Sequence, residues 1–128
     1  MPEPGSETFN RTVEARDDLF VSDLAVTEAI SALARRLRQG AVTQDFVRRV
    51  QHAIARGLDG GVYQRVELTR DVHRRAEHFL LSLTDTPLRA ADALHLALAT
   101  SVRAASVASF DERLRAAARA VGLGTYPA

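Results

Sequence analysis

Cysteine is absent from this chain of 128 residues, and so are tryptophan and lysine. Without cysteine the protein has no disulfides, no thiolate zinc site and no cysteine nucleophile, which fits a reducing cytoplasm. Its first residues, MPEPGSETF, are acidic and lack the basic and then apolar layout of a signal peptide. No apolar run approaches the roughly 20 residues of a membrane span. We therefore expect a soluble, cytoplasmic protein.

Sequence motifs of several enzyme classes are also missing. The chain contains no G-x-S-x-G, no P-loop and no G-x-G-x-x-G pattern, so serine-hydrolase and nucleotide-binding activities have no local support. The four histidines are poorly spaced for a zinc site. His73 and His78, for example, lie on different sides of a helix.

Because lysine is missing, all 17 basic residues are arginine, and 16 acidic residues nearly balance them. With a formal net charge of +1 the chain has no strong overall attraction to nucleic acid, so an RNA-binding surface must be a local patch. Arginine binds phosphates through two parallel hydrogen bonds. Our candidates for RNA contacts are Arg48, Arg49 and Arg56, which share one predicted helix face with His52. A solvated helix face is the alternative.

The hydrophobic pattern predicts a single α/β domain over residues 1–128, in which helices alternate with short strands. Ser22, Thr43 and Thr69 each precede an apolar stripe of helical period, and each is a good N-cap residue. The stripes place Phe46 and Leu80 among the buried residues. The predicted helices span 7–16, 23–39, 44–58, 70–83, 88–104 and 111–123, and the predicted strands span 19–22, 62–68, 106–110 and 124–128.

One acidic residue, Asp92, interrupts the apolar run LRAADALHLALAT. In a helix that begins at Leu88, alanines and leucines cover nearly the whole circumference, which is typical of a helix packed on several sides. A carboxylate there is at least partly enclosed, and a buried carboxylate needs a cationic partner. An ion pair with Arg89 or His95, both neighbours on the helix surface, is one alternative.

Two further acidic residues have more than one interpretation. Glu28 lies away from the apolar stripe of its helix, among mostly small or apolar neighbours, and a solvated glutamate is the alternative. Asp111 follows a predicted strand and opens a helix, where open α/β sheets bind their ligands. A helix N-cap is the alternative for Asp111, and Ser109 is an equally plausible cap.

Together these acids point to metal chemistry. If Glu28, Asp92 and Asp111 converge on one face, they repel one another unless a divalent cation neutralises them. Oxygen ligands without cysteine suit Mg²⁺ or Mn²⁺. Such an ion polarises a phosphodiester and activates water, which is the chemistry of hydrolytic nucleases. An α/β domain with helix-surface acids explains the periodicity but not the three motifs together.

Three segments in this order, FVSDLAVTEAISALARRLRQG, LRAADALHLALA and SFDERLRAAARAVGL, resemble the PIN-domain ribonucleases, in particular the VapC toxins of bacterial VapBC toxin–antitoxin systems. The resemblance covers essentially the whole chain. It implies a three-layer α/β/α fold with a short parallel sheet, RNA cleavage with Mg²⁺ or Mn²⁺, a cognate antitoxin and a homodimer. It also implies that Glu28, Asp92 and Asp111 are catalytic and hold the metal, with Ser109 at a common hydroxyl position.

The chain departs from this family at its beginning. The family starts with a central strand that ends in an aspartate ligand of the metal, and EPGSETF resembles the segment that follows this strand and its helix. About 17 residues, one average strand and one average helix, are then missing. The neighbours of that strand would lie about 9 to 10 Å apart, so they must close up, recruit another chain or stay poorly ordered.

The missing aspartate affects the expected function. It removes one negative charge from the pocket, so we expect weak metal binding by this chain. A start codon upstream of Met1 is one explanation for the departure. The other is a catalytically impaired PIN-domain remnant that binds an antitoxin or another partner.

Overall fold

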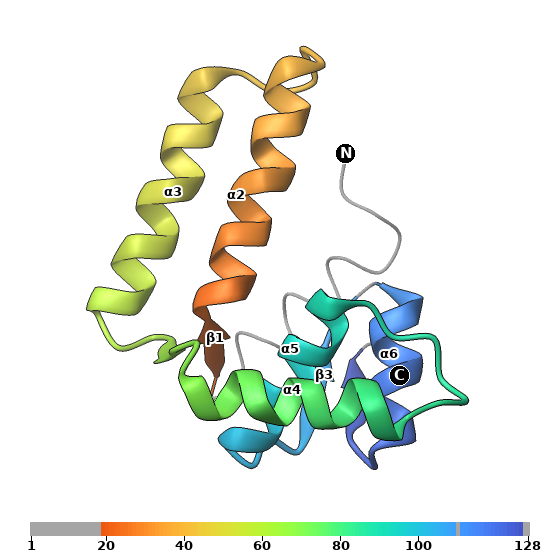
Figure 1. Ribbon diagram of the computed structural model, residues 1–128. Helices are drawn as coiled ribbons and strands as arrows, with labels where there is room; N and C mark the ends of the chain where they lie inside the picture. Colours follow the sequence, from red (N-terminus) through yellow and green to blue (C-terminus); the bar gives the residue numbers. More distant parts are fainter. Residues whose placement is uncertain (1–18, 110, 127–128) are drawn as a thin grey trace. The chain divides into compact units, whose positions relative to one another are not determined.

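The computed structural model describes residues 19–109 and 111–126, which fall into two compact units. We call residues 19–66 the hairpin unit and residues 67–109 with 111–126 the core unit. Figure 1 follows the chain through both units. Each unit combines helices with one pair of short parallel strands, so the predicted α/β class is confirmed. None of the helices within the described ranges has the length and apolar content that a membrane crossing requires.

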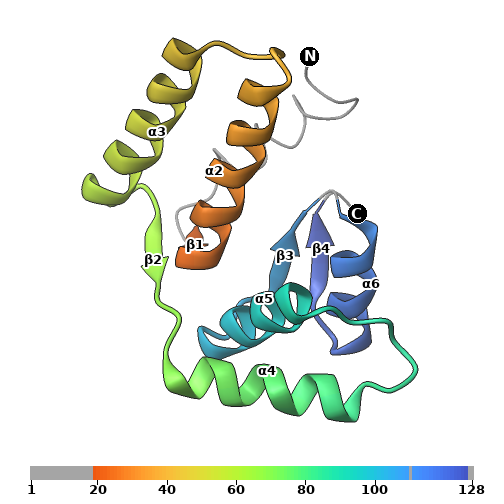
Figure 2. The same cartoon turned by 45° about the horizontal axis from the view of Figure 1, so that its top comes forward.

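The hairpin unit consists of two long helices that lie side by side and a pair of strands (Figures 1 and 2). Ser22 and Thr43 cap the two helices, as predicted. Their hydroxyl oxygens accept hydrogen bonds from the N–H groups of Ala25 at 2.9 Å and Phe46 at 3.1 Å. The two strands run parallel. The elements are β1 (Phe20–Ser22), α2 (Asp23–Arg38), α3 (Gln44–Asp59) and β2 (Gln64–Val66).

Phe46 is not a core residue, and that prediction was wrong. Its side chain is 42% exposed, and Leu37 at the end of α2 is 37% exposed. Both lie at the end of the hairpin away from β1 and β2, where α2 and α3 are the elements of this unit that can cover them. The period of an apolar stripe shows which side of a helix is apolar, but a further layer must cover that side before it is buried.

Gly57 in α3 gives the ring of Tyr63 a place to pack. Gly57 is buried, and its carbonyl oxygen accepts hydrogen bonds from the N–H groups of Val62 at 2.9 Å and Tyr63 at 3.2 Å. A Cβ atom at position 57 would lie 2.4 Å from Cε2 and 2.6 Å from Cδ2 of Tyr63. These distances are too short for carbon atoms, so the ring would have to move.

We expect Gly57→Ala to lower the free energy of unfolding by about 1 to 3 kcal/mol, because a methyl group overpacks the contact with Tyr63. Urea unfolding measures this change. In a Tyr63→Leu background the same substitution should have a much smaller effect, since the ring is gone. An equal loss in both backgrounds would show that Tyr63 is not the cause.

The core unit contains three helices and the second pair of strands. Thr69 caps its first helix, as predicted, by accepting a hydrogen bond from the N–H of Val72 at 3.3 Å. The two strands are parallel (Figure 2), and Val107 pairs with Thr125. The first helix packs along the second, and the third packs on the second and on the strands. The elements are α4 (Arg70–Ser82), α5 (Ala90–Ser101), β3 (Ser106–Ala108), α6 (Glu112–Ala120) and β4 (Gly124–Tyr126).

The hydrophobic core of this unit lies between α5 and α6. Leu96 of α5 and Ala117 and Ala118 of α6 have no exposed surface, and Leu114 is 7% exposed. Residues 92, 93, 96, 97 and 98 are all buried, so the prediction that α5 is packed on several sides is confirmed. Partly buried side chains that pack against this core are Phe79, Leu83, Leu88, Val107, Val121 and Leu123.

Some sequence-based expectations differ from the structure. Leu80 is 39% exposed, because it lies at the edge of the stripe formed by Val72, Ala76 and Phe79. The predicted helix 88–104 is shorter, at Ala90–Ser101. The described strands form two parallel pairs, one in each unit. The predicted helix at 7–16, the segment on which the predicted loss of the first strand rests, and residues 110, 127 and 128 lie outside the described residues.

Candidate active site

Asp92 is the buried acidic residue of the core unit. It lies in the first turn of α5, and the residue as a whole is 6% exposed. Its Oδ2 atom accepts a hydrogen bond from the backbone N–H of Arg89 at 3.0 Å. The described ion pairs within each unit are made by Asp23, Asp45 and Glu112, and not by Asp92. The predicted alternative was an ion pair with Arg89 or His95, and the described bond of Asp92 is instead to the Arg89 backbone.

This bond gives Asp92 a structural role at the start of α5. The first N–H groups of a helix have no partner within the helix, and a carboxylate near them is also favoured by the helix dipole. The bond occupies Oδ2 and leaves a desolvated negative charge without a cationic side chain in the described residues. Such a group fits a bound cation, because burial makes an uncompensated carboxylate unfavourable.

Asp111, and not the alternative Ser109, is the N-cap residue of α6. The Asp111 carboxylate accepts a hydrogen bond from the N–H of Arg113 at 2.9 Å, and Ser109 Oγ accepts one from the N–H of Asp111 at 3.0 Å. The N-cap alternative for Asp111 is therefore confirmed. Its exposed side chain lies between β3 and α6, at the position predicted for a metal ligand.

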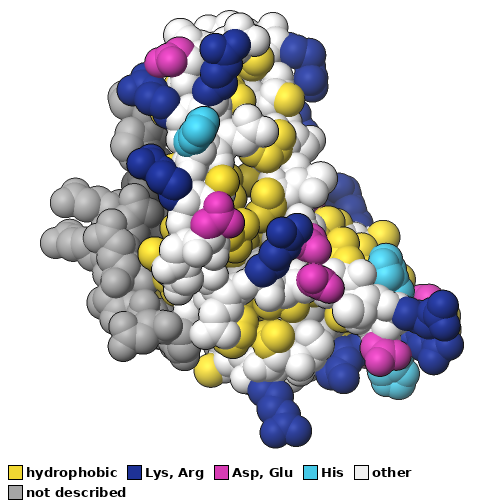
Figure 3. All heavy atoms as spheres, turned by 90° about the vertical axis from the view of Figure 1, so that its left-hand side faces the viewer, with side chains coloured by type: hydrophobic (Ala, Val, Ile, Leu, Met, Phe, Trp, Pro, Cys, Tyr) yellow, Lys and Arg dark blue, Asp and Glu magenta, His cyan; other side chains and the backbone are white. Residues whose placement is uncertain are grey.

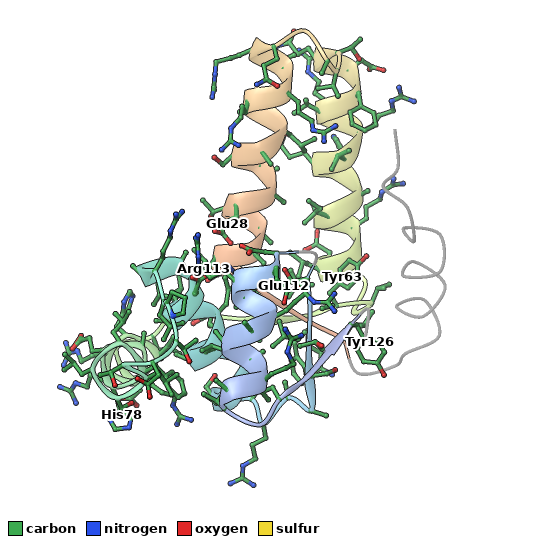
Figure 4. All side chains as sticks on the ribbon, turned by 90° about the vertical axis from the view of Figure 1, so that its right-hand side faces the viewer. Glu28, Tyr63, His78, Glu112, Arg113 and Tyr126 are labelled. Atoms are coloured by element: carbon green, nitrogen blue, oxygen red, sulfur yellow. The ribbon has the colours of Figure 1, made fainter. Side chains whose placement is uncertain are left out.

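Glu28 lies on α2 of the hairpin unit with an exposed side chain (Figure 4). Asp92 and Asp111 belong to the core unit, so the assignment of all three acids to one site stays a prediction. Within either unit, the described residues contain no group of three His, Asp or Glu side chains that could hold a metal ion. The core unit by itself offers two of the three predicted ligands.

The basic face of α3 is exposed, as predicted. Arg48, Arg49, His52 and Arg56 all have exposed side chains, and Figure 3 views the molecule from this side. Arg49 pairs with Asp45 at 3.2 Å, but side-chain exposures of 74% and 77% make this contact weak. The face therefore keeps most of its positive charge available to an anionic ligand.

The hairpin unit contains a cavity that its sequence does not predict. It encloses about 290 Å³ between α2 and α3, with Val26 and Ile30 on one wall and Ile54 and Leu58 on the other. Asp23 and Arg65 also line it and form an ion pair at 2.5 Å. The apolar stripes predict the apolar faces of α2 and α3. The cavity depends on the distance between these two faces, which is set by how the helices pack. The pairing of Asp23 with Arg65 requires the parallel alignment of β1 with β2.

Parallel strands with helices packed on them define an α/β domain, in which Asp92 and Asp111 lie at helix starts. The family model that matches this chain is the PIN domain, over residues 2–120. This range covers most of the chain and extends through both units, so the chain belongs to the PIN-domain family. PIN domains are generally nucleases, which supports a nuclease role here. None of the curated proteins compared with the chain gives a significant match.

Proposed function

We propose that this chain is a metal-dependent endoribonuclease of the VapC toxin type, which hydrolyses RNA phosphodiesters. The observation that carries the proposal is the buried carboxylate of Asp92, 6% exposed and without a cationic side-chain partner in the described residues. Membership of the PIN-domain family supports the nuclease part of the proposal. The resemblance of the three acidic segments to VapC toxins supports the choice of RNA as substrate.

The residues proposed to hold the ion are Asp92, Asp111 and Glu28. Oxygen ligands of this kind suit Mg²⁺ or Mn²⁺, and a bound ion would supply Lewis-acid activation of the phosphodiester. The protein's own contribution is to hold the carboxylates in place. The Arg89 N–H fixes Asp92 at the start of α5, and the bonds at Ser109 and Arg113 fix Asp111 at the start of α6.

Purified protein and a labelled RNA test this proposal directly. We expect cleavage in Mg²⁺ or Mn²⁺ and none in excess EDTA, because the carboxylates need the ion to act on a phosphodiester. If the folded protein leaves RNA intact with every metal ion, the nuclease proposal is wrong. If cleavage persists in EDTA, the proposed requirement for a metal ion is wrong.

The exposed arginines of α3 are the proposed contact with the RNA backbone. We expect Arg48→Gln with Arg56→Gln to weaken binding of RNA and to reduce the slope of log affinity against log salt concentration by about 1.4, for two lost phosphate contacts with a single strand. Fluorescence anisotropy in EDTA measures binding without cleavage. Arg74→Gln with Arg75→Gln removes the same charge from α4 and is the control. If the two double variants weaken RNA binding equally, binding depends on the net charge of the protein and not on the basic face of α3.

A cognate antitoxin and a second copy of the chain are the proposed partners, in the cytoplasm. Both follow from the resemblance to VapC toxins. Exposed apolar side chains offer support for protein contacts, with Leu81 at 82% and Val62 at 61% exposure.

A PIN-domain remnant that binds a partner but does not cleave RNA is the second candidate function. The exposed apolar side chains of Leu81 and Val62 favour it, because they offer surface for protein contacts. The RNA cleavage assay separates the two candidates. Partner binding without any cleavage would support the remnant.

A further inference from the structure

Arg115 in α6 is an almost buried arginine close to Asp111. Its side chain is 13% exposed, and its Nε atom is buried with no hydrogen-bond partner in the described residues. Nη1 donates a hydrogen bond to the carbonyl oxygen of Ser109 at 3.5 Å, and Nε lies 3.6 Å from Oε2 of Glu112. Both contacts are long, so the guanidinium is compensated only loosely.

The position of Arg115 is unfavourable for stability in two ways. Burial removes the hydration of the guanidinium, and two long contacts do not replace it. In addition, Arg115 lies only four residues after the N-cap Asp111, where the helix dipole disfavours a cation. The carboxylate of Glu112 makes its short contact with Arg119, which donates a 2.7 Å hydrogen bond to Oε1, while Oε2 stays 3.6 Å from Nε of Arg115. Stability alone therefore does not explain an arginine at this position.

The partner of Arg115, Ser109, is the residue that connects β3 to α6. The N–H of Ser109 donates to the carbonyl oxygen of Tyr126 in β4 at 3.0 Å, which extends the strand pairing by one residue. The hydroxyl oxygen of Ser109 accepts from the N–H of Asp111 at 3.0 Å. The carbonyl oxygen is the group that Arg115 holds. Ser109 is thus bonded to the strands, to Asp111 and to the body of α6.

We propose that Arg115 is a positioning residue: its hydrogen bond to the carbonyl of Ser109 helps to align Ser109 with the start of α6 and so contributes to the position of the Asp111 carboxylate. Side chains on a helix point back toward its N-terminus, so an arginine in the second turn reaches the residues before the helix. Asp111 has an exposed side chain, and packing alone does not fix it. The expected effect of Arg115 on RNA cleavage rests on the proposed function, whereas its effect on the position of Asp111 does not.

Arg119 provides a matched control, because it shares the Glu112 partner and the same helix. Its side chain is 48% exposed, and its described contact is with Glu112, which lies on the first turn of α6 (Figure 4). Replacing either arginine by methionine removes one positive charge and keeps an unbranched side chain. Arg115→Met also removes a desolvated charge, so we expect its free energy of unfolding to stay the same or to rise.

Amide hydrogen exchange tests the position of the junction without any activity. We expect Arg115→Met to speed exchange of the Asp111 and Arg113 amides by about tenfold, as loss of a hydrogen bond near the junction predicts. Exchange in α5 should stay unchanged, Arg119→Met should change neither region, and Arg115→Lys should restore part of the protection. Unchanged exchange at both amides in Arg115→Met overturns the proposal, and so does loss of protection throughout the core unit, which would make Arg115 a general stability residue.

Cleavage kinetics test the catalytic part. We expect Arg115→Met to lower kcat for RNA by about tenfold with KM unchanged, because a displaced carboxylate affects the reacting geometry more than RNA binding. Arg119→Met should keep the parental kcat. If the parental protein cleaves RNA and Arg115→Met cleaves it equally well, the positioning role is wrong. If the parental protein does not cleave RNA, the proposed function fails, and the exchange comparison still decides whether Arg115 holds the junction.

Discussion

Asp92→Asn lowers the rate of RNA cleavage in Mg²⁺ on the order of 100-fold or more, because loss of a metal-holding charge removes several kcal/mol of transition-state stabilisation. The substitution changes little else. Asparagine has the same shape, and its Oδ1 atom can accept the hydrogen bond that the Arg89 N–H now donates to Asp92. The expected loss of activity therefore comes from the removed charge, because the hydrogen bond at the N-terminus of α5 is kept.

Two measurements separate this loss from unfolding. The free energy of unfolding of Asp92→Asn should fall by about 1 to 3 kcal/mol at most, since the new buried amide N–H₂ lacks an assigned acceptor. Asp85→Asn is the control, because Asp85 is exposed in the loop before α5 and carries the same charge. Its cleavage rate should match the parental protein. Full activity in Asp92→Asn would show that the active site lies elsewhere.

Leu96→Ala should produce the largest loss of stability, about 2 to 5 kcal/mol. Leu96 has no exposed surface and lies at the centre of the core between α5 and α6. Removing the isopropyl end of its side chain loses the transfer free energy of the buried atoms and leaves a cavity that alanines cannot fill by changing rotamer. The same helices carry Asp92 and the residues after Asp111. On heating, we therefore expect Leu96→Ala to lose RNA cleavage at a lower temperature than the parental protein does.

Leu81→Ala is the matched control for Leu96→Ala. The chemical change is identical, but Leu81 is 82% exposed. We expect its free energy of unfolding to change by no more than about 0.5 kcal/mol. Urea unfolding of both variants gives the comparison. Similar losses in the two variants would mean that the core is not where the structure places it.

Local signals in the sequence predicted the helix starts well. Ser22, Thr43 and Thr69 cap helices through their own hydroxyls within three residues, so no distant contact is needed. Burial was predicted less well. Phe46 and Leu80 lie on or beside apolar stripes, but the layer that would cover them is a property of the packed chain.

For the candidate site too, local features were predicted from the sequence and packing contacts were not. The sequence placed Asp92 in an enclosed helix and Asp111 at a strand–helix junction, and both positions are confirmed. It did not predict that the Arg89 backbone would bind Asp92, or that Arg115 would bind Ser109. Those contacts depend on backbone geometry at a helix start and on rotamers, which residue spacing does not specify. The convergence of the acids depends on both units and stays a prediction.

The packing of Tyr63 on Gly57 has a spectroscopic consequence. The chain has two tyrosines and no tryptophan, and the structure places Tyr63 in the hairpin unit and Tyr126 in the core unit. Tyr126→Phe therefore leaves a fluorophore that reports on the hairpin unit alone, and Tyr63→Phe leaves one that reports on the core unit alone. Coincident melting of the two signals would show that residues 1–128 unfold as one cooperative domain, as the sequence predicts. Separate transitions would instead make each half of this PIN domain a folding unit of its own.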